Sequence, residues 1–231
     1  MVSILLLLAA QAPASAEPPA PPPQATRRAD PATRRQEQRR RWQPALLQRF
    51  ARCFVEDNPG IAAEIVDPPL SAGAETRRIR LRRAQLPIDR CLSISLGRNH
   101  MFGMLISADI GVALPVLLGA FAEHLYTSRF DALPPLAPAD VPPASNPEDA
   151  PAHFTYLFAS CLIDRDAASV DRLVRSHVGS DEESAVFAAL AGHYGGCLDQ
   201  GSAMELNRIT LRAALADQIY RRALARSGPA G

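Results

Sequence analysis

The sequence predicts an all-α protein of two related helical modules, each stapled by a disulfide bond and joined by a proline-rich linker. One unit occurs twice along the chain. FARC, which ends at Cys53, returns as FASC, which ends at Cys161, and LLGAFAEHLY (117–126) returns as LRAALADQIY (211–220). Apolar residues of the second copy recur at helical spacing, and no alternating strand pattern accompanies them.

The N-terminus resembles a signal peptide. A short apolar run ends in Ala14-Ser15-Ala16, the small-x-small pattern that signal peptidase accepts, so we expect residues 1–16 to be removed. The run is shorter than the roughly 20 residues of a membrane-spanning helix. All 25 basic residues are Arg, a bias typical of a GC-rich bacterial genome. The expected location is the bacterial periplasm or the exterior, and the alternative is an uncleaved apolar segment.

Two segments are too rich in proline and too poor in large apolar residues to form a core. Residues 17–42 are predicted to be a disordered Pro/Arg-rich arm, and residues 131–152 a semi-rigid linker. A short disordered tail is expected at 227–231. Two modules of near-minimal domain size remain, at 43–130 and 153–226.

The first two helices of the second module follow from spacing and end signals. Apolar residues from Phe154 to Leu162 fall on one face of a helix. Asp166 is predicted to cap the next helix, which carries His177 on an apolar stripe and ends at Gly179, where a left-handed residue is needed.

Two further helices complete that module. Ser180 and Glu183 form a capping box that opens a third helix, and Gly195-Gly196 are expected to stop it before Cys197. A fourth helix is predicted over 209–225. Its solvent-facing side is expected to carry four polar residues: Asp217, Gln218, Arg221 and Arg222.

The first module is predicted to follow the same plan. Pro59 starts a short second helix that Pro68-Pro69 must end. Residues 77–86 alone fit either a strand or a helix. Their counterpart in the second module is predicted to be a capped helix, so we expect a helix here as well, broken by Pro87. From the second cysteine to the shared tyrosine there are 35 residues here (Cys91 to Tyr126) and 23 in the other copy, so an insertion of 12 lies around 101–110.

The apolar stretch 101–122 raises the alternative of a membrane span. Asp109 and Pro115 interrupt it, and its counterpart in the second module carries Arg212, Asp217 and Arg221. A repeated unit would not span a bilayer in one copy and lie in water in the other. We therefore expect a buried or inter-module helix.

Four cysteines allow three pairings. The spacing within each module is similar, at 38 residues (Cys53 to Cys91) and 36 (Cys161 to Cys197). Bonds within each module are favoured, because a single ancestral unit would already have had its own bond. Each would contribute about 4 kcal/mol by closing a loop of this length. Redox chemistry is disfavoured because no Cys-x-x-Cys occurs.

No catalytic residue, metal ligand or cofactor is predicted. The Cys and His residues do not form the two close ligand pairs of a typical zinc motif, and no phosphate loop or nucleophile elbow is present. His177 is expected to be a core residue. The alternative is a helical periplasmic hydrolase, with a cleft around Asp109, His177 and His193.

Arginines form two clusters. The first, in the arm, is a possible anion-binding set: Arg27, Arg28, Arg34, Arg35, Arg39, Arg40 and Arg41. The second comprises Arg77, Arg78, Arg80, Arg82, Arg83 and Arg90. They could attach the chain to an anionic envelope component or to another envelope protein, and the alternative is solvated surface. Nucleic acid is disfavoured, because no aromatic side chains interleave the arginines.

The repeated pattern of FAxC, a capped helix, Cys-Leu and LRAALADQIY resembles a group of uncharacterised exported proteins of sphingomonad-type alphaproteobacteria. The resemblance covers about 46–126 and 154–220, and it implies no activity or site residue. The expected function is therefore a non-catalytic envelope protein that acts as a scaffold or binding module.

Overall fold

The computed structural model describes residues 31–67, 79–81, 83, 84, 90, 91, 114–139, 141, 150–198 and 207–227, with only the backbone of 31–43 and 150–152. The described part is all-α, it contains no strand, and two disulfide bonds staple it. The predicted fold class is thus confirmed. The signal segment 1–16, Arg27, Arg28, the insertion at 101–110 and the end of the tail lie outside the described residues.

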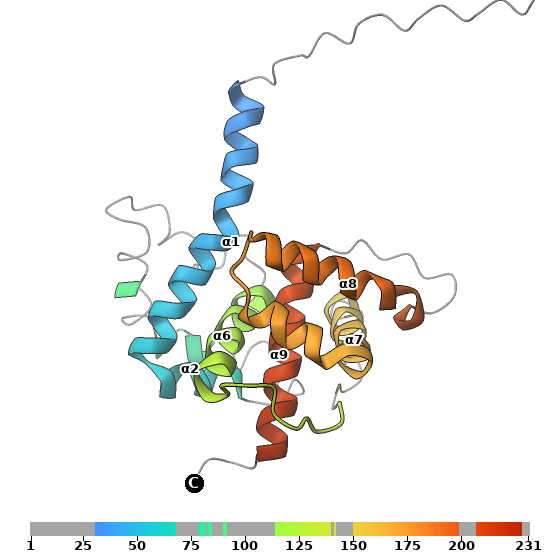
Figure 1. Ribbon diagram of the computed structural model, residues 1–231. Helices are drawn as coiled ribbons and strands as arrows, with labels where there is room; N and C mark the ends of the chain where they lie inside the picture. Colours follow the sequence, from blue (N-terminus) through green and yellow to red (C-terminus); the bar gives the residue numbers. More distant parts are fainter. Residues whose placement is uncertain are drawn as a thin grey trace, which may run out of the picture.

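The helices whose bounds the described residues fix are α1 (Pro31–Asp57), α2 (Pro59–Val66), α6 (Leu114–Arg129), α7 (Ala150–Arg175), α8 (Asp181–Cys197) and α9 (Arg208–Ser227). Helices α6 and α9 lie side by side at the centre (Figure 1). Helices α1 and α2 pack against α6, α7 packs against α9, and α8 packs against α7. Each half of the chain thus contributes its last helix to a central pair.

Proline marks the start of several helices. α1 and α2 begin with Pro31 and Pro59, and Pro115 and Pro151 are the second residues of α6 and α7. Proline suits these positions because the first N–H groups of a helix have no intrahelical acceptor. α2 ends at Val66, before Pro68-Pro69, as predicted. Residues 79–81 and 83 are helical, which agrees with the helix expected over 77–86.

The caps predicted in the second half are present. Asp166 interrupts α7 with φ −154° and ψ 71°, and its Oδ1 accepts the N–H of Ser169 at 2.9 Å. Gly179 has φ 81°, in the left-handed region. Ser180 Oγ accepts the N–H of Glu183 at 3.1 Å, and Glu183 Oε2 accepts the N–H of Gly179 at 2.6 Å. These bonds set the turn that separates α7 from α8.

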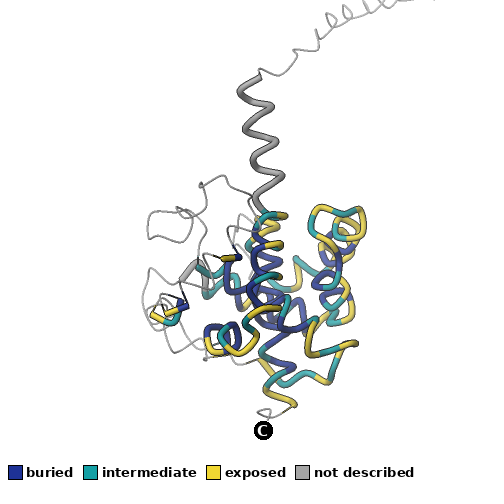
Figure 2. The backbone as a smooth tube through the Cα atoms, turned by 90° about the vertical axis from the view of Figure 1, so that its left-hand side faces the viewer, coloured by how far each residue is buried: buried dark blue, intermediate teal, exposed yellow. Residues whose placement is uncertain are grey.

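One hydrophobic core runs through both halves of the chain. Its largest fully buried aromatic side chains come from both: Tyr126, Tyr220, Phe50, Phe54, Phe121 and Phe158. Phe54 stacks on Phe121 with ring centroids 4.8 Å apart, which joins α1 to α6. Figure 2 shows the buried segments gathered at the middle of the helical body. The helix at 114–129 is therefore buried between the halves, as expected of a buried or inter-module helix.

Some predicted boundaries are wrong. α1 already begins at Pro31, inside the arm predicted to be disordered, and its first half stands clear of the body (Figure 1). The segment RRQEQRRRWQ consists mostly of strong helix formers, which favours this extension. α7 begins at Ala150, inside the predicted linker. α8 continues through Gly195-Gly196 to Cys197, whose bond to Cys161 on α7 holds its end.

Candidate functional site

Of the four polar residues of α9 expected to face solvent, Asp217, Gln218 and Arg222 are buried and Arg221 is half-buried, so that prediction is wrong. Asp217 is 0% exposed and Arg212 is 4% exposed, and Gln218 and Arg222 are also buried. The physical reason is that α6 and α7 both pack against α9, so that little of this helix remains free. Charged groups in such a place must be paired with one another.

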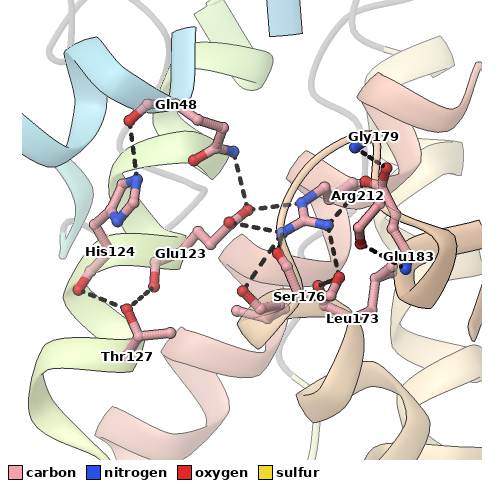
Figure 3. Close-up of polar contacts among 11 residues, drawn as sticks. Gln48, Glu123, His124, Thr127, Leu173, Ser176, Gly179, Glu183 and Arg212 are labelled. Carbon is pink, nitrogen blue, oxygen red and sulfur yellow. Dashed lines mark hydrogen bonds and ion pairs between the residues drawn. The ribbon is translucent and has the colours of Figure 1, made fainter. Parts of the chain in front are cut away.

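Arg212 lies at the centre of a polar network (Figure 3). Its Nε and Nη2 donate to the two carboxylate oxygens of Glu123 at 2.9 and 2.7 Å. Nη1 donates to Glu183 Oε1 at 2.8 Å, and Nη2 also donates to the carbonyl of Ser176 at 2.8 Å. One guanidinium thus joins α6, α8, α9 and the turn after α7.

Glu123 is 5% exposed and has a second donor, because Gln48 Nε2 of α1 donates to its Oε2 at 3.1 Å. Burial raises the pKa of the Glu123 carboxyl, against the lowering effect of the bonds from Arg212 and Gln48. Burial also acts to lower the pKa of Arg212, but Glu123 and Glu183 outweigh it and the pKa is raised. The bidentate geometry is that of an ion pair.

His124, the next residue on α6, is neutral. Its Nε2 lies 3.1 Å from the carbonyl oxygen of Gln48, and a carbonyl only accepts, so this nitrogen carries the proton. Burial lowers the pKa of His124 to about 4, and the positive charges of Arg52 and Arg212 act in the same direction. The imidazole therefore serves as a fixed donor between α6 and α1.

Two cavities of about 670 and 580 Å³ flank this network. Gln48, Glu123 and Val178 line both of them. The first extends along α1 and the end of α7 to Arg52 and His177, and the second has apolar walls that include Leu47, Val116 and Ile209. Both cavities therefore lie directly beside the buried charges of the network.

The other buried charges of α9 also bind neighbouring elements. Asp217 accepts from Arg221 at 3.0 Å, and Arg221 donates to the carbonyl of Val66 at the end of α2. Arg222 donates to Asp164 of α7 at 2.6 Å and to the carbonyl of Ala137 at 2.7 Å. Through Arg221 and Arg222, α9 is thus joined to α2, to α7 and to the segment at Ala137, all of them distant in the sequence.

The geometry favours holding helices together over acid–base chemistry. Both oxygens of Glu123 accept hydrogen bonds, and the hydroxyl of Ser176 donates to the Leu173 carbonyl at 2.7 Å. Among the described residues, Cys53, Asp57 and Cys91 come close enough together to suggest a metal site. The two sulfurs are bonded to each other, so they cannot serve as thiolate ligands.

Both predicted disulfides are present. Cys53–Cys91 and Cys161–Cys197 have Cα–Cα distances of 5.6 and 5.7 Å. These distances are ordinary for disulfide bonds.

The predicted anion-binding arginines are not tested by the structure. Arg34, Arg35, Arg39, Arg40 and Arg41 lie on α1, where only the backbone is described. In the second cluster, Arg80 donates to the carbonyl of Glu64, and Arg90 lies 3.9 Å from Asp57.

The residues of the alternative hydrolase cleft do not form one site among the described residues. His177 is exposed, so its prediction as a core residue is wrong: α7 ends at Arg175, and His177 lies in the turn. His193 Nε2 lies 3.9 Å from Asp166, and His193 lines neither cavity beside the network. Asp109 lies outside the described residues.

Sequence reasoning missed Glu123, His124 and Arg212. One signal was available, because the repeated segment carries an acid at the same place in both copies, Glu123 and Asp217, among apolar residues. Comparison with family models, curated proteins and solved structures finds no match for this chain.

Proposed function

We propose that the chain is an exported, non-catalytic binding or scaffold protein of the bacterial envelope. The observation that supports this best is the use of its buried ionisable groups: Arg212, Glu123 and Glu183 bond one another across helices. A catalytic centre would instead keep a base or nucleophile free to meet a substrate.

The compartment is supported by the disulfides. Two such bonds suit an oxidising space such as the periplasm or the exterior. No described helix is long and apolar enough to span a membrane. Export itself rests on the sequence pattern that ends at Ala16.

The cavities beside Glu123 are the favoured place for a bound partner group. They are lined by apolar walls and by the Gln48–Glu123–Arg212 network. The Oε1 atom of Gln48 is buried and accepts no hydrogen bond from a described residue. A partner group with an N–H or O–H donor on an apolar stem would satisfy this acceptor.

The test compares the wild-type chain with two tryptophan variants. Val178→Trp fills the region shared by both cavities, whereas Ala188→Trp places the same side chain on the exposed surface of α8. Envelope components retained by the wild type and by Ala188→Trp should be lost from Val178→Trp, with all three proteins equally folded by circular dichroism. Equal retention by Val178→Trp would refute the cavities as the binding place.

The hydrolase alternative has its own test. Ester, phosphate, glycoside and peptide probes should show no turnover that depends on His124. Turnover by the wild type that disappears in a folded His124→Gln variant would overturn the non-catalytic proposal, because a Gln amide can still donate to the Gln48 carbonyl but cannot act as an acid or base.

A second candidate is attachment to anionic envelope surfaces through the arm. It is favoured by α1, whose first half carries five of the seven arm arginines away from the body (Figure 1). Each Arg close to an anionic membrane contributes about 1 kcal/mol, which salt screens. Removal of residues 17–42 should abolish binding to phosphatidylglycerol vesicles and leave the helical fold intact. Binding that is indifferent to salt or to the truncation would make the arm a spacer.

A further inference from the structure

We propose that the contact between α6 and α9 is a self-complementary interface between two copies of one ancestral unit. Each half of the chain would then be the binding partner of the other, and an uncut chain would not be needed to keep them together. This goes beyond the proposed function and does not depend on it.

The first observation is a contact between corresponding positions. Aligning 117–126 with 211–220 pairs Gly119 with Ala213. These two residues touch: a Cβ on Gly119 would lie 2.4 Å from both the Cα and the carbonyl oxygen of Ala213. In a two-fold interface, residues at the axis meet their own counterparts. A contact of Gly119 with Ala213 is what such an axis through the α6–α9 pair requires.

The second observation is a pair of crossed hydrogen bonds. Tyr126 of the first half donates to Asp171 of the second half at 2.7 Å. Its counterpart Tyr220, of the second half, donates to Asp67 of the first half at 2.8 Å. Asp171 lies on the part of α7 that follows the kink, and Asp67 ends α2, so each acceptor belongs to the second helical segment of its half. The two donors correspond and both bonds cross to the second helical region of the other half, but counted from Cys53 and Cys161 the acceptors are offset by about one helical turn.

An arginine accompanies each crossed tyrosine. The guanidinium of Arg175 lies 5.3 Å from the ring centre of Tyr126, and that of Arg129 lies 5.5 Å from the ring centre of Tyr220. Arg175 comes from the half opposite its tyrosine, and so does Arg129. Burial raises the pKa of both tyrosines, which keeps their hydroxyls protonated as donors. Each tyrosine thus has a cation–π partner from the other half, although Arg129 lies on α6 and Arg175 on α7, so these two contacts are not equivalent under the two-fold relation.

The symmetry does not extend to the ion pairs of the two buried acids. Glu123 pairs with Arg212 across the two helices, whereas its counterpart Asp217 pairs with Arg221 on its own helix. Position 118, the counterpart of Arg212, is a leucine. Such divergence is expected once two copies are joined in one chain, because each side of the interface then mutates separately.

The experiment cuts the full-length chain after it has folded. A protease recognition site is inserted between 142 and 149, and the purified protein is cleaved. Both disulfides lie within a half, so they do not connect the fragments. We expect the two fragments to elute together at the mass of one chain at micromolar concentration. Separation of the wild-type fragments under these conditions would overturn the proposal.

Phenylalanine variants test the two crossed hydrogen bonds. Tyr126→Phe and Tyr220→Phe should each raise the dissociation constant of the cleaved halves by roughly tenfold or more, and by similar factors, because each removes a hydrogen bond to a carboxylate. Tyr194→Phe is the matched control, since that ring packs against Phe158 within the second half. Gly119→Leu should separate the cleaved halves altogether. An unchanged dissociation constant in either tyrosine variant would refute the two-fold relation.

Discussion

Arg212 and Glu123 show how the cost of burying charge is met at the scale of single residues. Their side chains are 5% and 7% exposed and make two parallel N–H···O bonds. Glu183 and the Ser176 carbonyl accept further hydrogen bonds from the guanidinium. Removing one partner would leave the others buried with no compensating charge, which costs more than the pair itself contributes.

Arg212→Met should therefore lower the free energy of unfolding by about 3–5 kcal/mol, because Glu123 and Glu183 lose their cation. Arg226→Met is the control, since Arg226 lies on the same helix and is exposed. Adding Glu123→Gln to Arg212→Met should recover part of the loss. Urea unfolding measures all three, and a double variant less stable than Arg212→Met would contradict the pairing.

His124 should make stability depend on pH. Its pKa is lowered from 6.5 to about 4 in the folded protein, so below pH 6.5 the unfolded chain binds a proton that the folded chain does not. Stability should fall as pH decreases from 6.5 to 4, by roughly 3 kcal/mol from this residue. Unfolding of wild type and His124→Gln across this range should show a shallower slope in the variant. Equal slopes would mean that His124 is not held neutral.

At the scale of elements, local sequence signals determine the kink of α7, whereas packing determines which side of α9 is buried. The kink of α7 was predictable because Asp166 carries its own capping group and bonds the N–H of Ser169. The buried side of α9 was not predictable, because an Arg on a helix looks the same in sequence whether it faces water or Glu123. Its surroundings come from α6 and α7, which are remote in the chain.

Asp166→Ala should cost about 1 kcal/mol, since it removes the cap of the second segment of α7. Asp166→Ser should retain most of the stability, because a hydroxyl also accepts the N–H of Ser169. The pKa of Asp166 is lowered chiefly by a hydrogen bond from the Ser169 side chain and, to a smaller extent, by the capping bond from the Ser169 N–H. Thermal unfolding at neutral pH compares the variants, and equal losses for Ala and Ser would argue against capping.

At the scale of the whole molecule, the two halves share one core and differ in how their staples are protected. Cys91 is fully buried, whereas Cys53, Cys161 and Cys197 are half-buried. The bond of the first half therefore has a sulfur that a reductant reaches only after local opening. Both bonds close loops of similar length, so their effects on the unfolded chain should be alike.

Mild reduction should open Cys161–Cys197 before Cys53–Cys91, as followed by alkylation and peptide mapping. Loss of either bond should lower the free energy of unfolding by about 4 kcal/mol. Because the core is shared, each cysteine-pair variant should unfold in one transition for both halves. Two separate transitions would show that the halves fold independently.

The sequence by itself determined the class of fold, the pairing of the cysteines and those helix ends that carry their own cap or a proline. Helical spacing, Pro59, Asp166, Gly179 and the Ser180–Glu183 box act through neighbours within a few residues, so their effects are readable along the chain. The similar cysteine spacing in each half likewise favoured two separate staples.

Only the tertiary structure decided which polar residues are buried and what they bind. Glu123 and Arg212 are 89 residues apart, and Tyr220 is 153 residues from Asp67. Contacts over such separations depend on how α6 and α9 cross, which no local pattern specifies. The same packing left His177 exposed and placed His124, half-buried, against α1, because burial is a property of the assembled helices and not of the residue type.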